Sequence, residues 1–154
     1  VLSLSGVSAV ICLEGINDFG RGVDASVESV SATMREVVGR IRDRIRGVTV
    51  VGATLVSALH STNGAHGSAE EDQKRHALNA FIRTSGVFDA VADFDAATID
   101  AATGELRPQF VPDNTTGGAG DRLHPNRAGY AAMAHAIYLT KLGLGPAMLC
   151  SRKP

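Results

Sequence analysis

The sequence predicts an α/β domain built on a parallel β-sheet with helices packed against it. Segments rich in β-branched residues alternate along the chain with segments whose apolar residues recur at helical spacing. Strands and helices that alternate in this order form βαβ units, which make the strands parallel and cover the sheet with helices. A length of 154 residues and an apolar content of 44% suit one domain with a core. We expect that domain over residues 1–145 and a tail over residues 146–154.

The first strand and the first helix are predicted on either side of a glycine-rich loop. Residues 7–13 form a short apolar run, which is typical of a strand buried on both faces. Residues 15–24 contain three glycines and read as a loop. From residue 25 to residue 46, apolar residues repeat at helical spacing with charges between them, which predicts a long amphipathic helix. Asp24 and Ser26 are alternative caps for its start.

A second strand and a second helix follow. Residues 48–55 have the composition of another buried strand, and the polar residues 57–69 read as a loop at its carboxyl end. Residues 70–84 are predicted to be helical. The apolar residues expected on the inward face of that helix are Ala77, Leu78 and Phe81.

The last third of the chain is predicted to contain a short strand and one helix. The strand falls within residues 87–94, and the Gly/Pro/Thr-rich residues 100–120 are expected to be irregular. Residues 128–142 form the last predicted helix. Pro125 suits its beginning, because proline fixes φ near the helical value and lacks the N–H that a first turn cannot use.

Net charge and hydropathy indicate which kinds of binding partner to expect. Fifteen basic and sixteen acidic residues leave a net charge of −1, so we expect no binding to nucleic acid or to an anionic membrane surface. No apolar run reaches the length of about 18 residues that spans a bilayer. A small molecule is therefore the expected partner, and no residue pattern calls for a cofactor.

Cysteine and histidine spacing predicts no metal site. Cys12 and Cys150 lack CxxC spacing and indicate neither a disulfide scaffold nor a zinc site, although a single bridge between them remains an alternative. His60, His66 and His76 could be considered as ligands, but their spacing matches no compact site.

The first strand raises the question of what pairs with it. Three strands are few for such a sheet, and an apolar strand at a free edge would invite aggregation. The chain also begins with Val1 and enters this strand within a few residues. We therefore expect a complementing segment, either one or two strands that precede Val1 in a longer protein or strands supplied by another chain.

Asp121 and His124 are the first candidate site residues. A carboxylate three residues before an imidazole can hold the ring in one tautomer and leave its other nitrogen free to act as a general base. The alternative is a surface loop in which Asp121 caps a turn and His124 precedes a helix by chance.

Two motifs in order resemble a known family. Gly15-Ile16-Asn17-Asp18 directly follows the first strand, and Asp121-Arg122-Leu123-His124-Pro125 follows about a hundred residues later. Together they resemble the third and fifth sequence blocks of the SGNH hydrolases, also called the GDSL esterase/lipase family. Residues 79–86 and 88–94 look like the connecting region of its bacterial esterase-like members. The resemblance implies a three-layer, flavodoxin-like SGNH hydrolase fold, incomplete at the N-terminus, and a carboxylic ester hydrolase that needs no cofactor.

The resemblance also implies roles for three residues. His124 would be the general base and later the acid, Asp121 would orient it, and Asn17 would donate its side-chain N–H to the oxyanion. These roles agree with the chemistry of acyl transfer, which needs a proton acceptor beside the attacking hydroxyl and donors where negative charge develops. The expected substrate is a small-molecule ester.

The chain departs from the family at its nucleophile. The Gly-Asp-Ser block that carries the family's serine is absent from the 154 residues, as is the block with the oxyanion glycine. Without a nucleophile no acyl-enzyme forms, so the serine would have to come from outside this chain. The alternative is a catalytically inactive, hydrolase-like binding module for a glycan or a partner protein. Many members of the family are secreted, and secretion is an expectation from the resemblance alone.

Overall fold

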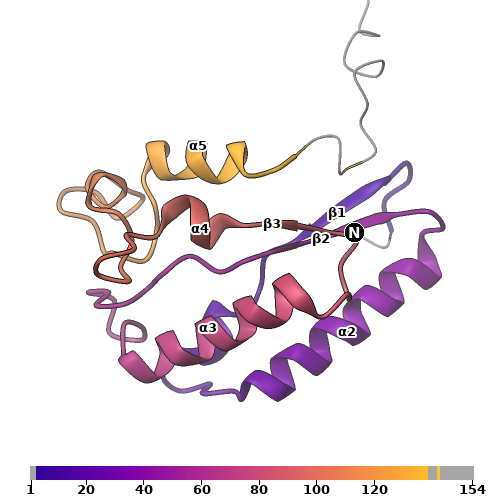
Figure 1. The fold of residues 1–154 in the computed structure, drawn as a ribbon, viewed down its shortest axis with the longest axis horizontal. Coiled ribbons are helices and arrows are strands. Elements are labelled where there is room, and N and C mark those ends of the chain that lie inside the picture. Colours follow the sequence, from indigo (N-terminus) through magenta and orange to yellow (C-terminus); the bar gives the residue numbers. More distant parts are fainter. Residues whose placement is uncertain (1–2, 139–141, 143–154) are drawn as a thin grey trace, which may run out of the picture.

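The computed structural model describes residues 3–138 and 142, which form a three-layer α/β fold (Figure 1). Its middle layer is a parallel sheet in the order β1 (Ala9–Cys12), β2 (Thr49–Ala53) and β3 (Ala90–Ala92). The predicted α/β class with a parallel sheet is confirmed.

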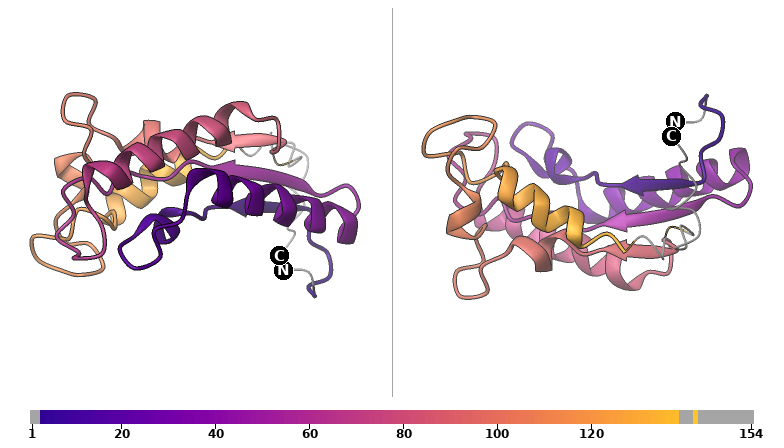
Figure 2. Two further views of the ribbon diagram at one scale, coloured as in Figure 1. Left: turned by 90° about the horizontal axis from the view of Figure 1, so that it is seen from below. Right: turned by 90° about the horizontal axis from the view of Figure 1, so that it is seen from above.

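Helices cover the two faces of this sheet. Five α-helices and a 3-10 turn are found in the described residues: α1 (Ile16–Phe19), α2 (Val27–Arg44), α3 (Ala69–Thr84), α4 (Phe94–Thr98), η1 (Pro108–Phe110) and α5 (Arg127–His135). Helices α2 and α3 lie side by side on one face, and α5 lies on the opposite face (Figure 2). None of these described helices has both the length and the hydropathy to cross a membrane.

The central strand β2 is buried on both sides, as predicted. Val50 packs with Val38 and Ile41 of α2, whereas Val51 packs on the other face with Met133 of α5. Side chains alternate between the two faces of a strand, so β2 contributes to both cores.

Strand β1 is not buried on both faces, and that prediction is wrong. Ile11 and Leu13 are each 41% exposed. Among the described residues β1 pairs with β2 alone, so it is an edge strand. Ile11 is in register with Val51, on the face that α5 covers over β2 but not over β1.

The buried side of α3 is polar where the sequence predicted alanine. Ala77 is exposed, while Arg75 is fully buried beside Leu78. The Arg75 guanidinium lies 2.7 Å from Asp72 Oδ1 through Nε and 2.5 Å from Asp95 Oδ1 through Nη1. A buried arginine is tolerated only when carboxylates and hydrogen bonds offset its desolvation, and here both are present.

The Asn79 side chain, on α3, binds the main chain of Leu55, which lies just beyond the end of β2. Its Oδ1 accepts from Leu55 N–H at 2.7 Å, and its Nδ2 donates to the Leu55 carbonyl at 2.9 Å. Arg75 Nη1 donates to the same carbonyl at 3.3 Å. We call Asn79, Arg75 and Leu55 the Leu55 clamp. Because Leu55 lies beyond the sheet, the clamp supplies the hydrogen bonds that a neighbouring strand would otherwise provide.

Two short helices lie in segments where none was predicted. The expected loop over residues 15–24 contains α1, and α4 follows β3 directly. Asp93 starts α4 by accepting a hydrogen bond from Ala96 N–H at 3.1 Å. Turns this short carry too little hydrophobic periodicity for the sequence to reveal them.

Helix α5 is shorter than the predicted residues 128–142. It begins at Arg127 rather than at Pro125, because Asn126 Oδ1 caps it by accepting from the N–H groups of residues 128 and 129. It ends at His135, after which Ile137 packs against the core between α5 and the sheet. The proposed boundary at residue 145, the tail over residues 146–154 and Cys150 lie outside the described residues.

Replacing Asn79 by alanine should test the Leu55 clamp. The change leaves a buried N–H without a partner and weakens the bonding of a buried carbonyl, so we expect a loss of about 2–4 kcal/mol in the free energy of unfolding, measured by urea denaturation. Gln73→Ala on the exposed side of the same helix should change it by less than about 0.5 kcal/mol. Equal effects of the two substitutions would show that the clamp does not stabilise the fold.

Candidate active site

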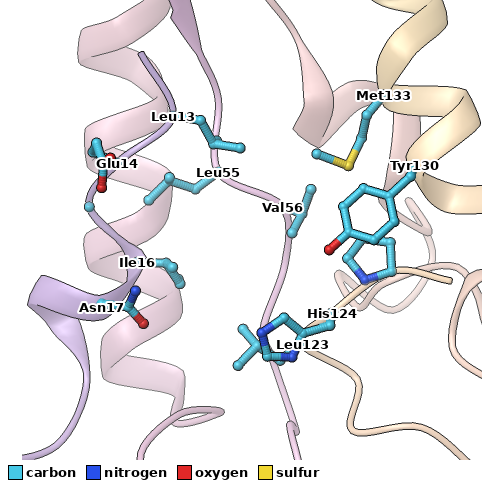
Figure 3. A pocket seen from close by; sticks show the side chains of 12 residues that line it. Leu13, Glu14, Ile16, Asn17, Leu55, Val56, Leu123, His124, Tyr130 and Met133 are labelled. Carbon is cyan, nitrogen blue, oxygen red and sulfur yellow. The ribbon is translucent and has the colours of Figure 1, made fainter. Parts of the chain in front are cut away.

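A pocket of about 170 Å³ opens at the carboxyl ends of β1 and β2. Asn17 and His124 lie on opposite sides of it (Figure 3). Its remaining wall is mainly apolar and includes Leu55, Val56 and Met133. Ligands of open α/β sheets bind at this end of the strands.

Asn17 reaches the pocket because of the glycine two residues before it. Gly15 is buried and has φ +123°, a conformation that favours glycine. A Cβ at this position would lie 2.6 Å from Leu78 Cδ2 of α3. Glycine therefore lets the chain turn sharply from β1 into α1 against α3, and the exposed Asn17 side chain is left at the pocket rim.

Asp121 and His124 form a tight turn in which the carboxylate has two tasks. Asp121 Oδ1 accepts from the N–H groups of Leu123 at 3.1 Å and His124 at 2.9 Å. Asp121 Oδ2 lies 2.7 Å from His124 Nδ1. Asp121 thus caps a turn, as the alternative interpretation held, and also holds the imidazole.

This arrangement determines the tautomer of a neutral His124. A carboxylate can only accept, so Nδ1 carries the proton and Nε2 keeps its lone pair. The side chain is 46% exposed and lines the pocket. His124 can therefore take a proton from a group bound there.

Asp121 is ionised over a wide pH range. Burial of the carboxylate raises its pKa, but hydrogen bonds outweigh that effect and lower the pKa to about 2. The donors, in order of effect, are the His124 main chain, the His124 ring, the Leu123 main chain and the Asn114 amide. Because donors to the charged form favour it, Asp121 stays an acceptor for the imidazole at neutral pH.

Three segments distant in sequence meet at this turn. Ser61 Oγ donates to the Asp121 carbonyl at 2.8 Å, and Thr62 N–H donates to the same oxygen at 3.0 Å. Glu105 lies 3.1 Å from Arg122 Nη1. The loop after β2 and the segment after α4 therefore both support the turn. The turn and Asn17 both lie at the carboxyl ends of the strands.

The described pocket wall offers no ordinary nucleophile. Its lining contains no serine, threonine or cysteine. The described residues also contain no group of three or more His, Cys, Asp and Glu side chains that could hold a metal ion. Each histidine considered as a ligand instead pairs with one carboxylate: His60 with Glu105, His66 with Glu71 and His76 with Asp72.

Several residues at the site were not predicted from sequence, among them Asn114, Val56 and Tyr130. Asn114 binds Asp121 from a segment expected only to be irregular. Val56 and Tyr130 line the pocket. Tyr130 could have been predicted, because it lies in the first turn of the helix that follows His124. No motif or periodicity near Asn114 indicates that it binds Asp121.

Replacing Asp121 by asparagine should remove one component of acid sensitivity. The folded-state pKa of Asp121 lies below the ordinary value of about 3.9, so its stabilisation is complete above about pH 4 and is lost as the pH falls towards 2. The stability difference between the protein and Asp121→Asn should therefore shrink by about 2 kcal/mol between pH 6 and pH 2, measured by urea denaturation. Asp113→Asn, the same substitution at an exposed position in the same segment, is the matched control. A stability difference between the protein and Asp121→Asn that is the same at pH 6 and pH 2 would contradict the lowered pKa of Asp121.

Solved structures share this fold. A GDSL-like lipase from Bacteroides thetaiotaomicron superposes with a TM-score of 0.70 at 15% identity, over 87% of this chain and 62% of its own. A protein from Bacteroides fragilis assigned as an acylhydrolase gives a TM-score of 0.62 at 16% identity, over 87% of this chain and 61% of its own. The present chain thus spans less than two thirds of either. No curated protein sequence matches it significantly.

The sequence also matches the model of a protein family. The model of the GDSL-like lipase/acylhydrolase family aligns with residues 2–132, which include both motifs and all three candidate residues. The match covers most of the chain and agrees with the fold of the solved structures. The chain belongs to the GDSL-like lipase/acylhydrolase family.

Proposed function

We propose that the protein acts as a carboxylic ester hydrolase of the SGNH type. The observation that carries the proposal is the Asp121–His124 pair, which faces Asn17 across one pocket. His124 Nε2 takes the proton of an attacking serine and later returns it to the leaving alcohol. Asp121 keeps the imidazole in the correct tautomer, and the Asn17 amide donates to the oxyanion of the tetrahedral intermediate.

The serine in this mechanism comes from outside the described chain. Its Oγ forms the acyl-enzyme bond while the alcohol leaves, and a water molecule then releases the acid with His124 again accepting a proton. The apolar wall of Leu55, Val56 and Met133 favours an ester with a small apolar group beside the reacting carbon. No metal or cofactor is required for these steps.

Turnover of p-nitrophenyl acetate by the whole protein should test the roles of His124 and Asn17. His124→Ala should lower kcat by at least about 10³-fold, because the general base is lost. Asn17→Ala should lower it by about 10²–10³-fold through loss of one oxyanion donor.

His135→Ala is the matched control for His124→Ala, because His135 is an exposed histidine at the end of α5. It should leave the rate unchanged. Equal rates for the protein and His124→Ala would remove His124 from the mechanism. A protein that never hydrolyses the ester but binds a glycan or partner would instead fit the binding-module alternative.

We further propose that a strand of the whole protein adds to the free edge of β1 and brings the serine. The Ser8 carbonyl accepts from Thr49 N–H at 2.9 Å, so the alternation along β1 directs the main-chain groups of Ala9 and Ile11 away from β2. An apolar edge of this kind is a template for a further strand. The greater length of the two solved relatives supports a segment of the same protein over a second chain.

Ile11→Pro should distinguish a paired edge from a free one. Proline removes only an N–H that faces away from β2, so at a free edge the substitution is tolerated. We expect it to destabilise the whole protein by about 2–3 kcal/mol more than the 154-residue chain alone, measured by urea denaturation. Equal losses in the two proteins would argue against an added strand.

A further inference from the structure

We propose that Asn114 is a positioning residue for the Asp121–His124 pair, an inference that rests on the function proposed above. Asn114 lies in the irregular segment between η1 and the turn and is only 9% exposed. It does not line the pocket, so it would act on the reaction through Asp121 and His124 alone.

The Asn114 side chain uses all of its hydrogen-bonding capacity at this site. Nδ2 donates to Asp121 Oδ1 at 2.8 Å and to the His124 carbonyl at 2.7 Å. Oδ1 accepts from Thr116 N–H at 2.9 Å and from Thr116 Oγ1 at 2.7 Å. Because the two partners of Nδ2 can only accept, the amide has one orientation, and exchanging its oxygen and nitrogen would break both bonds.

The turn that Asn114 binds has an unfavourable backbone. Arg122, between Asp121 and Leu123, has φ +58°, a left-handed conformation that is unfavourable for a non-glycine residue. Such a conformation persists only where neighbouring contacts hold it. Asn114 joins the carboxylate at the start of the turn to the carbonyl at its end, so one side chain fixes both limits of the strained segment.

This geometry has a chemical consequence for the imidazole. Asp121 Oδ2 faces His124 Nδ1 only while Oδ1 is held on the other side of the carboxylate. The main-chain donors to Oδ1 come from the turn itself, and Asn114 is the donor that reaches it from a separate segment. Without Asn114 the carboxylate could rotate with the turn, and the proton on His124 would no longer be confined to Nδ1.

The test is the tautomer of His124, observed by NMR of ¹⁵N-histidine-labelled whole protein without substrate, at a pH at which the ring is neutral. We expect the Nδ1–H tautomer in the unmodified protein and a mixture of tautomers in Asn114→Ala. We also expect kcat for p-nitrophenyl acetate to fall by roughly 10- to 100-fold with little change in KM, because orientation of the base is lost while the pocket remains.

Asn126→Ala is the matched control. Asn126 makes the same kind of contacts: Nδ2 donates to the carbonyls of Gln109 and Pro112, and Oδ1 caps α5. Its removal should lower the urea midpoint of unfolding because a helix cap is lost, yet leave the His124 tautomer and kcat unchanged. Equal changes in the two variants, or no change in Asn114→Ala, would overturn the proposal.

A second variant covers the case in which Asn114→Ala fails to fold. Thr116→Val keeps Asn114 but removes the hydroxyl that donates to its Oδ1, so it should shift the tautomer in the same direction to a smaller extent. An unchanged tautomer in Thr116→Val would then overturn the proposal. Because the tautomer is read without turnover, a shift in a protein that lacks esterase activity would support the positioning role while contradicting the proposed function.

Discussion

The geometry of the pocket depends on the Leu55 clamp. Thr54 N–H still donates to the Ala92 carbonyl of β3 at 3.1 Å, and from Leu55 on the chain leaves the sheet. Asn79 satisfies both polar groups of Leu55, and Arg75 adds a third bond to the same residue. Since Leu55 and Val56 form part of the pocket wall, the site is held by hydrogen bonds to the main chain rather than by sheet pairing.

The clamp also joins α3 to α4. Asp95 at the start of α4 accepts from Arg75 through Oδ1 and from Arg83 through Oδ2, and both arginines lie on α3. Asp95 N–H donates to Thr54 Oγ1, which itself donates to Asp93. A fully satisfied polar network of this kind favours one arrangement of its elements, because each alternative leaves a buried charge unpaired. The β2 end, α3 and α4 are therefore positioned together.

The sequence predicts a structural feature well when the contact that determines this feature joins residues close together in the chain. Helix α2 was predicted well because its own periodicity selects the buried side, and Ser26 lies beside the N–H it caps. The polar buried side of α3 could not be predicted, because Asn79 is buried by a contact with Leu55, 24 residues away. For the same reason the contact between Asp121 and His124 is predictable from their three-residue spacing, whereas the contact of Asn114, seven residues before Asp121 in an irregular segment, is not.

The buried residues around the pocket hold the structure, whereas the two candidate residues that line the pocket are exposed. Asp121, Asn79 and Arg75 are buried, and each makes hydrogen bonds to the main chain. Buried or partly buried side chains also bind two of them, Asn114 for Asp121 and Asp95 for Arg75. Asn17 and the His124 ring are left accessible at the pocket. Preorganised donors and bases are effective because no reorganisation is needed when charge develops, and that requires rigid supports beneath exposed groups. In the proposed mechanism these supports would serve proton transfer by His124 and oxyanion binding by Asn17. The carboxyl end of β1 leads into the same pocket, so a strand added to β1 would bring its own carboxyl end close to these groups.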